Sequence, residues 1–253
     1  MIRPCAVVPV YDHAHAIGAV VEALLGAGLP CILVDDGSRA SCAAVLDQLA
    51  ATRPGVRVIR RPRNGGKGAA VADGLRAALA SGYTHALQVD ADGQHAVEDV
   101  PAFLAAAAAD PLAVICGRPV FDATMPRVRF YFRYLTHVLV WLNTLSLEVR
   151  DSMCGFRVYP LAATVAMIDE EHPGARMDFD VEVLVRLHWR GIPMHWIDTR
   201  VRYPTDGVSH FRLLLDNALI SRLHGMLFLG MLVRLPAIIV RRLSRRRTDR
   251  HAP

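Results

Sequence analysis

The chain has almost no lysine, no closely spaced cysteines and no long uninterrupted apolar run. Lys67 is the single lysine among 29 basic residues. The five cysteines include no Cys-x-x-Cys pair, which predicts buried, reduced thiols. No window holds eighteen uninterrupted apolar residues, so a conventional transmembrane helix is not expected. The apolar run near the N-terminus covers only about six residues, too short for the core of a signal peptide. These absences favour a cytoplasmic protein.

The net charge of +5 is concentrated at the C-terminus. Residues 241–253 contain six arginines and one aspartate, so the rest of the chain is balanced. A nucleic-acid binder usually carries a basic face across its fold, and this distribution disfavours that class. A neutral globule with a cationic tail instead fits an anionic surface such as a membrane. A solvated basic end is the alternative interpretation.

The pattern up to about residue 117 alternates short β-branched runs with Ala/Leu-rich stretches of helical period. Hydrophobic residues make up 53% and charged residues 21%, which excludes disorder as the main state. Four βα units predict an α/β fold with a mostly parallel sheet covered by helices on both faces. The expected strands are 5–10, 31–34, 56–60, 85–89 and 113–116. The expected helices are 14–27, 40–52, 68–81 and 97–109.

Beyond residue 117 the alternation fades. We expect helices near 127–147 and 178–190, a strand over 193–202, and two amphipathic segments over 208–224 and 225–243. In the first helix, apolar residues cover one face while Arg129, Arg133 and His137 follow another. The apolar face either packs on the sheet or contacts a membrane.

Polar or glycine-rich segments follow each of the first four expected strands. Ligands of parallel α/β sheets bind beyond the carboxyl ends of the strands, so this edge is the expected active site. After the fourth strand, Asp90, Asp92 and Gln94 offer the hard oxygen ligands that Mg²⁺ or Mn²⁺ takes. A calcium loop is excluded because it needs glycine at its sixth position, and Gly93 is the fourth. A phosphatase of the haloacid dehalogenase type, with Asp90 as nucleophile, remains the rival enzyme class.

The segment around Lys67 superficially resembles phosphate-binding glycine loops. Both the Walker and the dinucleotide patterns fail, because Pro62, Gly68 and Val71 occupy positions that those patterns reserve for other residues. Backbone N–H groups and one ammonium at a helix start would still suit a diphosphate or a neighbouring carboxylate. A simple helix-entry turn is the alternative. Of Asp35 and Asp36, one is expected to cap the next helix and the other to accept hydrogen bonds from a nucleoside.

Five segments together resemble family 2 glycosyltransferases of the GT-A fold, nearest to the dolichyl-phosphate mannose synthase-like branch. The resemblance covers roughly residues 3–210. Its motifs, in chain order, are Val8-Pro9-Val10-Tyr11, Val34-Asp35-Asp36-Gly37-Ser38, Asn64-Gly65-Gly66-Lys67-Gly68, Asp90-Ala91-Asp92-Gly93-Gln94-His95 and Asp151-Ser152-Met153-Cys154-Gly155-Phe156-Arg157.

This resemblance implies a site for a nucleotide-diphosphate sugar and a divalent ion. The residues that would hold the nucleotide sugar are Pro9, Tyr11, Asp36, Lys67 and Asp90. The Mg²⁺ or Mn²⁺ ligands would be Asp90, Asp92 and Gln94.

The resemblance also implies basic residues that face the donor and acceptor phosphates. Arg118 and Arg133 hold those positions, although Arg127 and Arg129 are close enough in sequence to compete with Arg133. Residues 203–210 resemble a late motif of the branch, with His210 where lysine is common.

The expected activity is transfer of a hexose from a GDP- or UDP-sugar to a lipid-linked acceptor, with inversion of the anomeric centre. Polyprenyl phosphate is the first choice of acceptor. Asp92, Arg118, Arg133 and Glu182 are the expected catalytic residues. Glu182, with Asp178 and Asp180, would supply a general base if the acceptor were a hydroxyl of another lipid or acyl product. A phosphohydrolase and a non-catalytic membrane adaptor are the alternatives of other classes.

The expected domain organisation is a GT-A domain over 1–210 and an amphipathic helical tail over 211–253. The arginine-rich end would attach the protein peripherally to the anionic inner face of the cell membrane. No nucleic-acid partner is expected.

Overall fold

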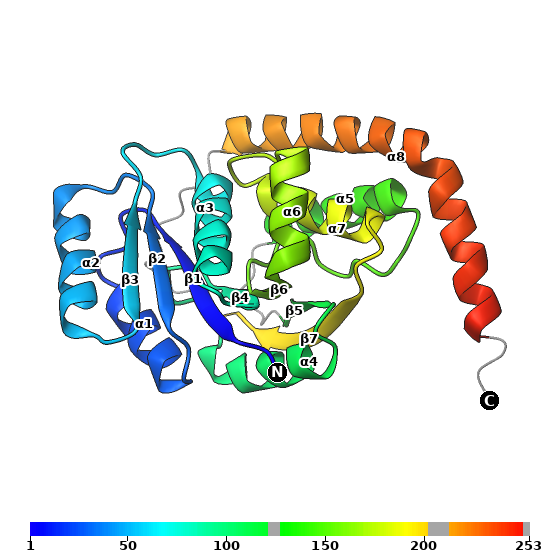
Figure 1. Ribbon diagram of the computed structural model, residues 1–253. Coiled ribbons are helices and arrows are strands. Elements are labelled where there is room, and N and C mark those ends of the chain that lie inside the picture. Colours follow the sequence, from blue (N-terminus) through cyan, green and yellow to red (C-terminus); the bar gives the residue numbers. More distant parts are fainter. Residues whose placement is uncertain (121–126, 202–212, 250–253) are drawn as a thin grey trace.

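The computed structural model describes residues 1–120, 127–201 and 213–249, and its strands form one seven-stranded sheet (Figure 1). The strands are β1 (Pro4–Val10), β2 (Cys31–Asp35), β3 (Val56–Arg60), β4 (His85–Gln88), β5 (Val114–Val120), β6 (Arg157–Pro160) and β7 (Met194–Arg200). They lie in the order β3-β2-β1-β4-β6-β5-β7. Strand β6 is antiparallel to both β4 and β5, and the other neighbouring pairs are parallel.

Helices cover both faces of this sheet. One face packs against α1 (Ile17–Gly26), α2 (Ala40–Thr52) and α4 (Val100–Ala109), and the other against α3 (Lys67–Ala80), α6 (Leu161–Glu171) and α7 (Phe179–Trp189) (Figure 1). Alternation along β1 produces the two cores, because successive side chains of a strand point to opposite faces. Cys5 and Val7 belong to the α3 side, whereas Ala6, Val8 and Val10 belong to the α1 side.

The predicted α/β architecture is confirmed, and two elements were missed. The five expected N-terminal strands and the strand over 193–202 are present as β1–β5 and β7. Helix α6 and strand β6 went unpredicted. Strand β6 was missed because it has only four residues and contains Arg157, a charged side chain that is fully buried. Burial of an arginine depends on its tertiary partners, which a strand pattern does not reveal. All five cysteines are buried, as expected.

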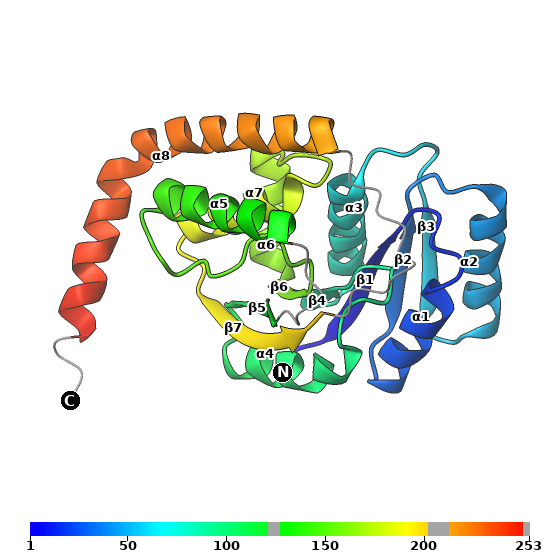
Figure 2. The same ribbon diagram turned by 180° about the vertical axis from the view of Figure 1, so that it is seen from behind.

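The two expected C-terminal segments form one helix, α8 (Leu213–Asp249). Pro236 lies inside it and cannot donate a backbone hydrogen bond to the preceding turn, which explains why α8 bends (Figures 1 and 2). Segment 202–212, which includes the start of the first expected segment and His210, lies outside the described residues.

The first part of α8 lies across α5 (Arg127–Thr144) and α7 (Figure 2). A buried stripe of α8 faces the domain and comprises Ile220, Leu223, Leu227 and Met231. A polar contact is buried among them, since His224 Nδ1 lies 3.1 Å from Asn143 Nδ2. Ala218–Val240 is also long and apolar enough to cross a membrane by length and composition, with 28% of that stretch buried. Part of α8 is therefore core, and part is exposed apolar surface.

Candidate active site

The turn after β4 carries the expected acidic ligands. Asp90 follows the buried strand, and Gly93 turns the chain with a φ of 74°. Asp92 Oδ1 accepts a hydrogen bond from the backbone N–H of Gln94 at 3.0 Å, which fixes the turn. A backbone bridge between His95 and Val201 then joins this segment to the end of β7. The turn is thus held at both ends.

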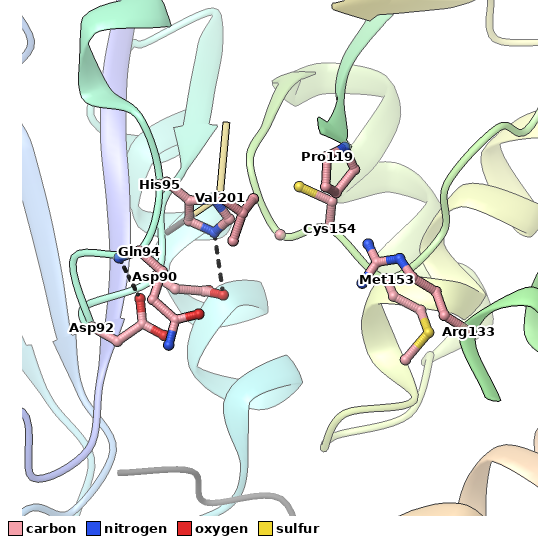
Figure 3. A pocket seen from close by; sticks show the side chains of 10 residues that line it. Asp90, Asp92, Gln94, His95, Pro119, Arg133, Met153, Cys154 and Val201 are labelled. Atoms are coloured by element: carbon pink, nitrogen blue, oxygen red, sulfur yellow. Dashed lines mark hydrogen bonds and ion pairs between the residues drawn. The ribbon is translucent and has the colours of Figure 1, made fainter. Parts of the chain in front are cut away.

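A polar pocket of about 110 Å³ lies beside this turn. Asp90, Asp92 and Gln94 line one wall, and Arg133 of α5 lies on the opposite wall (Figure 3). The structure therefore brings together the expected cation ligands and one of the two expected phosphate-binding arginines. Carboxylates facing a guanidinium across a cleft suit a ligand that carries both phosphate groups and a cation.

Lys67 lies directly behind the acidic wall. Its Nζ atom is 2.8 Å from Asp90 Oδ1 and 2.9 Å from Asp180 Oδ2. Burial by itself would raise the pKa of Asp90, but Lys67 and His95 together outweigh burial and hold that pKa well below its ordinary value. The sequence left open whether Lys67 faces a diphosphate or a carboxylate. In this structure its partners are carboxylates.

The glycine-rich loop before α3 folds around Asp36. The backbone N–H groups of Gly65 and Gly66 donate to its carboxylate at 2.9 and 2.8 Å, and Arg61 pairs with the same group. These donors are therefore turned towards a buried side chain. Asp36 is 2% exposed. Its carboxylate organises the loop in this structure, and its assignment to a nucleoside stays a prediction.

The other expected nucleoside residues lie at the same edge of the sheet. Pro9 belongs to β1 and Tyr11 follows it, and the N–H of Asp36 donates to the carbonyl of Val10 at 2.9 Å. None of these residues lines the pocket. The expected cap is wrong for both aspartates, because α2 begins at Ala40 after Arg39, which makes no side-chain cap. Asp35 instead accepts the N–H of Ser38.

Asp151 holds Arg133 in the pocket wall. Two guanidinium nitrogens of Arg133 donate to the Asp151 oxygens at 2.7 Å each. Asp151 also accepts the backbone N–H groups of Met153 and Cys154, at 2.9 and 2.8 Å. Burial would raise the pKa of Asp151, but His137 and Arg133 lower it further than burial raises it. A bidentate pair of this kind fixes the plane of the guanidinium.

Two expected catalytic residues lie away from the pocket lining. Arg118 forms a bidentate pair with Asp198 at 2.5 and 2.7 Å on the exposed ends of β5 and β7. Glu182 is buried in α7, where it accepts the N–H of Gly174 at 2.7 Å and the Nε–H of Arg186 at 2.7 Å. Both carboxylate oxygens of Glu182 are therefore engaged.

The pocket offers few protein ligands for a divalent cation. Within 1–120, 127–201 and 213–249, no set of three or more His, Cys, Asp or Glu side chains is arranged to hold a metal. Asp90 and Asp92 still supply two carboxylates, and the buried Asp90 Oδ1 accepts no hydrogen bond, since the Lys67 ammonium 2.8 Å away is its ion-pair partner only. Mg²⁺ is commonly bound by one or two carboxylates completed by substrate phosphates. These residues fit a cation that binds together with a diphosphate.

Sequence reasoning missed three contributors to the site. His95 lies 3.5 Å from Asp90 Oδ2 and stacks on Phe156. Asp180 was considered only as a base, and Asp151 was quoted only as part of a motif. The sequence did contain one clue to these residues. A buried lysine or arginine requires anionic or carbonyl partners from elsewhere in the chain.

Comparisons with known proteins agree with this geometry. Residues 5–167 match the family Glycosyl transferase family 2. The chain is 28% identical over 171 residues to polyprenol monophosphomannose synthase of Mycolicibacterium smegmatis, covering 62% of this chain and 61% of that protein. It is 30% identical over 180 residues to undecaprenyl-phosphate mannosyltransferase of Micrococcus luteus, covering 66% of this chain and 70% of that protein.

Solved structures show the same fold at lower identity. Glucosyl-3-phosphoglycerate synthase of Mycobacterium tuberculosis, solved with Mn²⁺ and UDP-glucose, has a TM-score of 0.65 at 16% identity, over 91% of this chain and 79% of that one. A mannosyltransferase of Pyrobaculum calidifontis, solved with GDP-mannose and Mn²⁺, has a TM-score of 0.54 at 15% identity, over 81% and 58%. The chain has the GT-A fold.

Replacing Asp151 by Asn should destabilise the protein by about 3 to 5 kcal/mol, because it leaves the Arg133 guanidinium without its buried partner. The matched variant Asp198→Asn breaks a pair whose side chains are 45% and 53% exposed. It should therefore cost at most about 1 kcal/mol. Urea unfolding of the three proteins measures both effects.

The pH dependence follows from the lowered pKa of Asp151. The stabilisation is fully present above the ordinary value of 3.8 and is lost as the pH falls below it. The gap between wild type and Asp151→Asn should stay constant from about pH 7 to 5 and narrow below about pH 4. Equal stability of the two Asp→Asn variants at pH 7 would contradict this account.

Proposed function

The chain belongs to glycosyl transferase family 2, and from that premise we propose that it transfers a hexose from a nucleotide-diphosphate sugar to polyprenyl phosphate. The observation that supports this most is the pocket in which Asp90, Asp92 and Gln94 face Arg133. The relatives named for polyprenol and undecaprenyl phosphate support the acceptor class. The family match also favours a glycosyltransferase over a phosphohydrolase.

In the proposed reaction, the donor diphosphate lies between the two walls of the pocket. Asp90, Asp92 and Gln94 would hold Mg²⁺ or Mn²⁺ against its oxygens. A bound divalent cation supplies Lewis-acid stabilisation of the negative charge that develops on the leaving diphosphate. Arg133, kept in place by Asp151, donates charge-assisted hydrogen bonds to a phosphate group. Attack from the opposite face of the sugar inverts the anomeric centre.

The proposed acceptor needs no general base. A phosphate monoester is largely dianionic at neutral pH, because its second pKa is about 6. Glu182, the expected base for a hydroxyl acceptor, is buried with both oxygens engaged by Gly174 and Arg186. We therefore favour the phosphate over a hydroxyl. Pro9, Tyr11 and Asp36 remain our proposed nucleoside-binding residues. Arg118 remains a proposed second phosphate contact, and its ion pair with Asp198 would have to break for it to bind a phosphate.

We also propose that residues 211–253 attach the enzyme peripherally to the cytoplasmic face of a membrane. Among the described residues, apolar side chains exposed on α5 include Tyr134, Leu135, Val138 and Leu142, and those on α8 include Met226, Leu229, Leu232, Val233 and Val240. The side chains beyond Val240 lie outside the described residues, but their sequence adds six arginines. Each arginine near an anionic leaflet contributes about 1 kcal/mol before screening.

A nucleotide panel tests the donor site. At about a hundred times its Kd, GDP or UDP with Mn²⁺ should stabilise the wild type by about 2.7 kcal/mol, read as a rise in Tm. Asp92→Asn should abolish the Mn²⁺-dependent part of that rise. Glu98→Gln, which removes an acid of the short helix Val97–Asp99 that does not line the pocket, should keep it. A full Mn²⁺-dependent shift in Asp92→Asn would show that the cation binds elsewhere.

Vesicle binding tests the membrane role of the tail. Because the attraction is electrostatic, removal of residues 241–253 should reduce binding to vesicles with anionic lipid by tenfold or more, about 1.4 kcal/mol or above. Binding of the full chain should weaken with salt, and neutral vesicles should show little difference between the two proteins. Undiminished binding of the shortened chain to anionic vesicles would refute the role assigned to the arginines.

A further inference from the structure

Asp180 occupies a position directly behind the proposed cation site. It lies in the first turn of α7 and is 5% exposed. Lys67 Nζ lies 2.9 Å from Asp180 Oδ2 and 2.8 Å from Asp90 Oδ1, so one ammonium joins the two carboxylates. Asp180 does not line the pocket. Lys67 is the contact that joins Asp180 to Asp90.

The orientation of Asp180 is fixed by neighbouring strands. The side-chain amide of Gln88, at the end of β4, donates to Asp180 Oδ1 at 3.0 Å. Arg157 of β6, which is fully buried, donates to the backbone carbonyl of Asp180 at 2.7 Å. The Tyr159 hydroxyl donates to Gln88 Oε1 at 3.3 Å. A carboxylate with both oxygens engaged in this way is poorly placed to act as a base.

Gly155 closes the remaining side of the cluster. A Cβ atom at this position would lie 2.8 Å from Lys67 Nζ and 3.1 Å from Asp90 Oδ1. Only glycine lets the backbone approach the ammonium this closely. The side chain of Lys67 is accordingly 16% exposed, and its charge is directed at the two carboxylates instead of at water.

We propose that Asp180 is a positioning residue for Asp90 and acts through Lys67. The inference rests on the proposed function, in which Asp90 contacts the cation. An ammonium shared between two carboxylates neutralises neither completely, so Asp90 keeps negative charge for a cation. Without the Asp180 charge, Lys67 would pair with Asp90 alone and compete with the cation for its oxygens.

The test is a Mn²⁺ titration by calorimetry at a fixed concentration of GDP and, separately, of UDP. Asp180→Asn keeps the shape of the side chain and removes its charge. We expect it to weaken Mn²⁺ binding about tenfold or more, as is typical for partners of metal ligands. Asp178→Asn, two residues away and in contact with the N–H of Arg176, is the matched control and should leave Mn²⁺ affinity within about twofold of wild type.

A double-mutant cycle tests whether the effect passes through Lys67. In a Lys67→Met background, adding Asp180→Asn should change Mn²⁺ affinity less than about twofold. Unchanged Mn²⁺ affinity in the folded single variant Asp180→Asn would overturn the inference. So would an equally large loss on adding Asp180→Asn to Lys67→Met.

A second variant covers the case in which Asp180→Asn does not fold. Asp180→Ser also removes the charge and leaves Lys67 and Asp90 unaltered, so it too should weaken Mn²⁺ binding, and unchanged affinity would overturn the inference. If the wild type shows no Mn²⁺-dependent nucleotide binding, the proposed function itself fails and the inference falls with it. Normal wild-type binding with unaffected variants refutes the inference alone.

Discussion

The Lys67 ammonium lies between the carboxylates of Asp90 and Asp180, and the position of the whole pocket depends on this contact. A buried ammonium without anionic partners is costly, so the elements that carry the three side chains are constrained to meet. Lys67 begins α3, Asp90 follows β4 and Asp180 lies in α7. The fully buried Arg157 adds a second cation beside Asp180, where it donates to the backbone carbonyl.

Arg133 relates the pocket to the proposed membrane surface. It lies on α5, and the next residues of that helix, Tyr134 and Leu135, are exposed. Helix α8 packs on α5 (Figure 2). It exposes further apolar side chains. In the proposed function, the helix that contacts the lipid therefore also carries Arg133, which would bind the lipid-borne phosphate. Asp151 keeps the guanidinium in place while that happens.

The sequence predicted those parts of the fold that depend on local pattern. Alternating strands and helices gave β1 to β5 and the edge at which polar segments gather. Asp90, Asp92 and Gln94 share a pocket with Arg133, although about forty residues separate them. Sequence spacing does not predict that these residues meet. The resemblance to a known family did predict it. Strand β6 was missed because a short strand with a buried arginine has no recognisable period.

The partners of charged groups could not be read from the sequence. Asp36 and Asp180 both looked available to ligands or to chemistry, yet one organises the glycine-rich loop and the other holds Lys67. The pairing of Arg118 with Asp198 likewise depends on β5 and β7 being neighbours in the sheet. Each of these contacts joins segments far apart in the chain, and only packing determines which carboxylate meets which cation.

The most direct measurement of the central claim is the anomalous diffraction of manganese in crystals grown with Mn²⁺ and GDP or UDP. A single strong peak is expected within coordination distance of Asp92, beside Asp90 and Gln94, with the diphosphate bound between that peak and Arg133. A nucleotide bound with its diphosphate away from this pocket, or a manganese peak at another site, would contradict the claim.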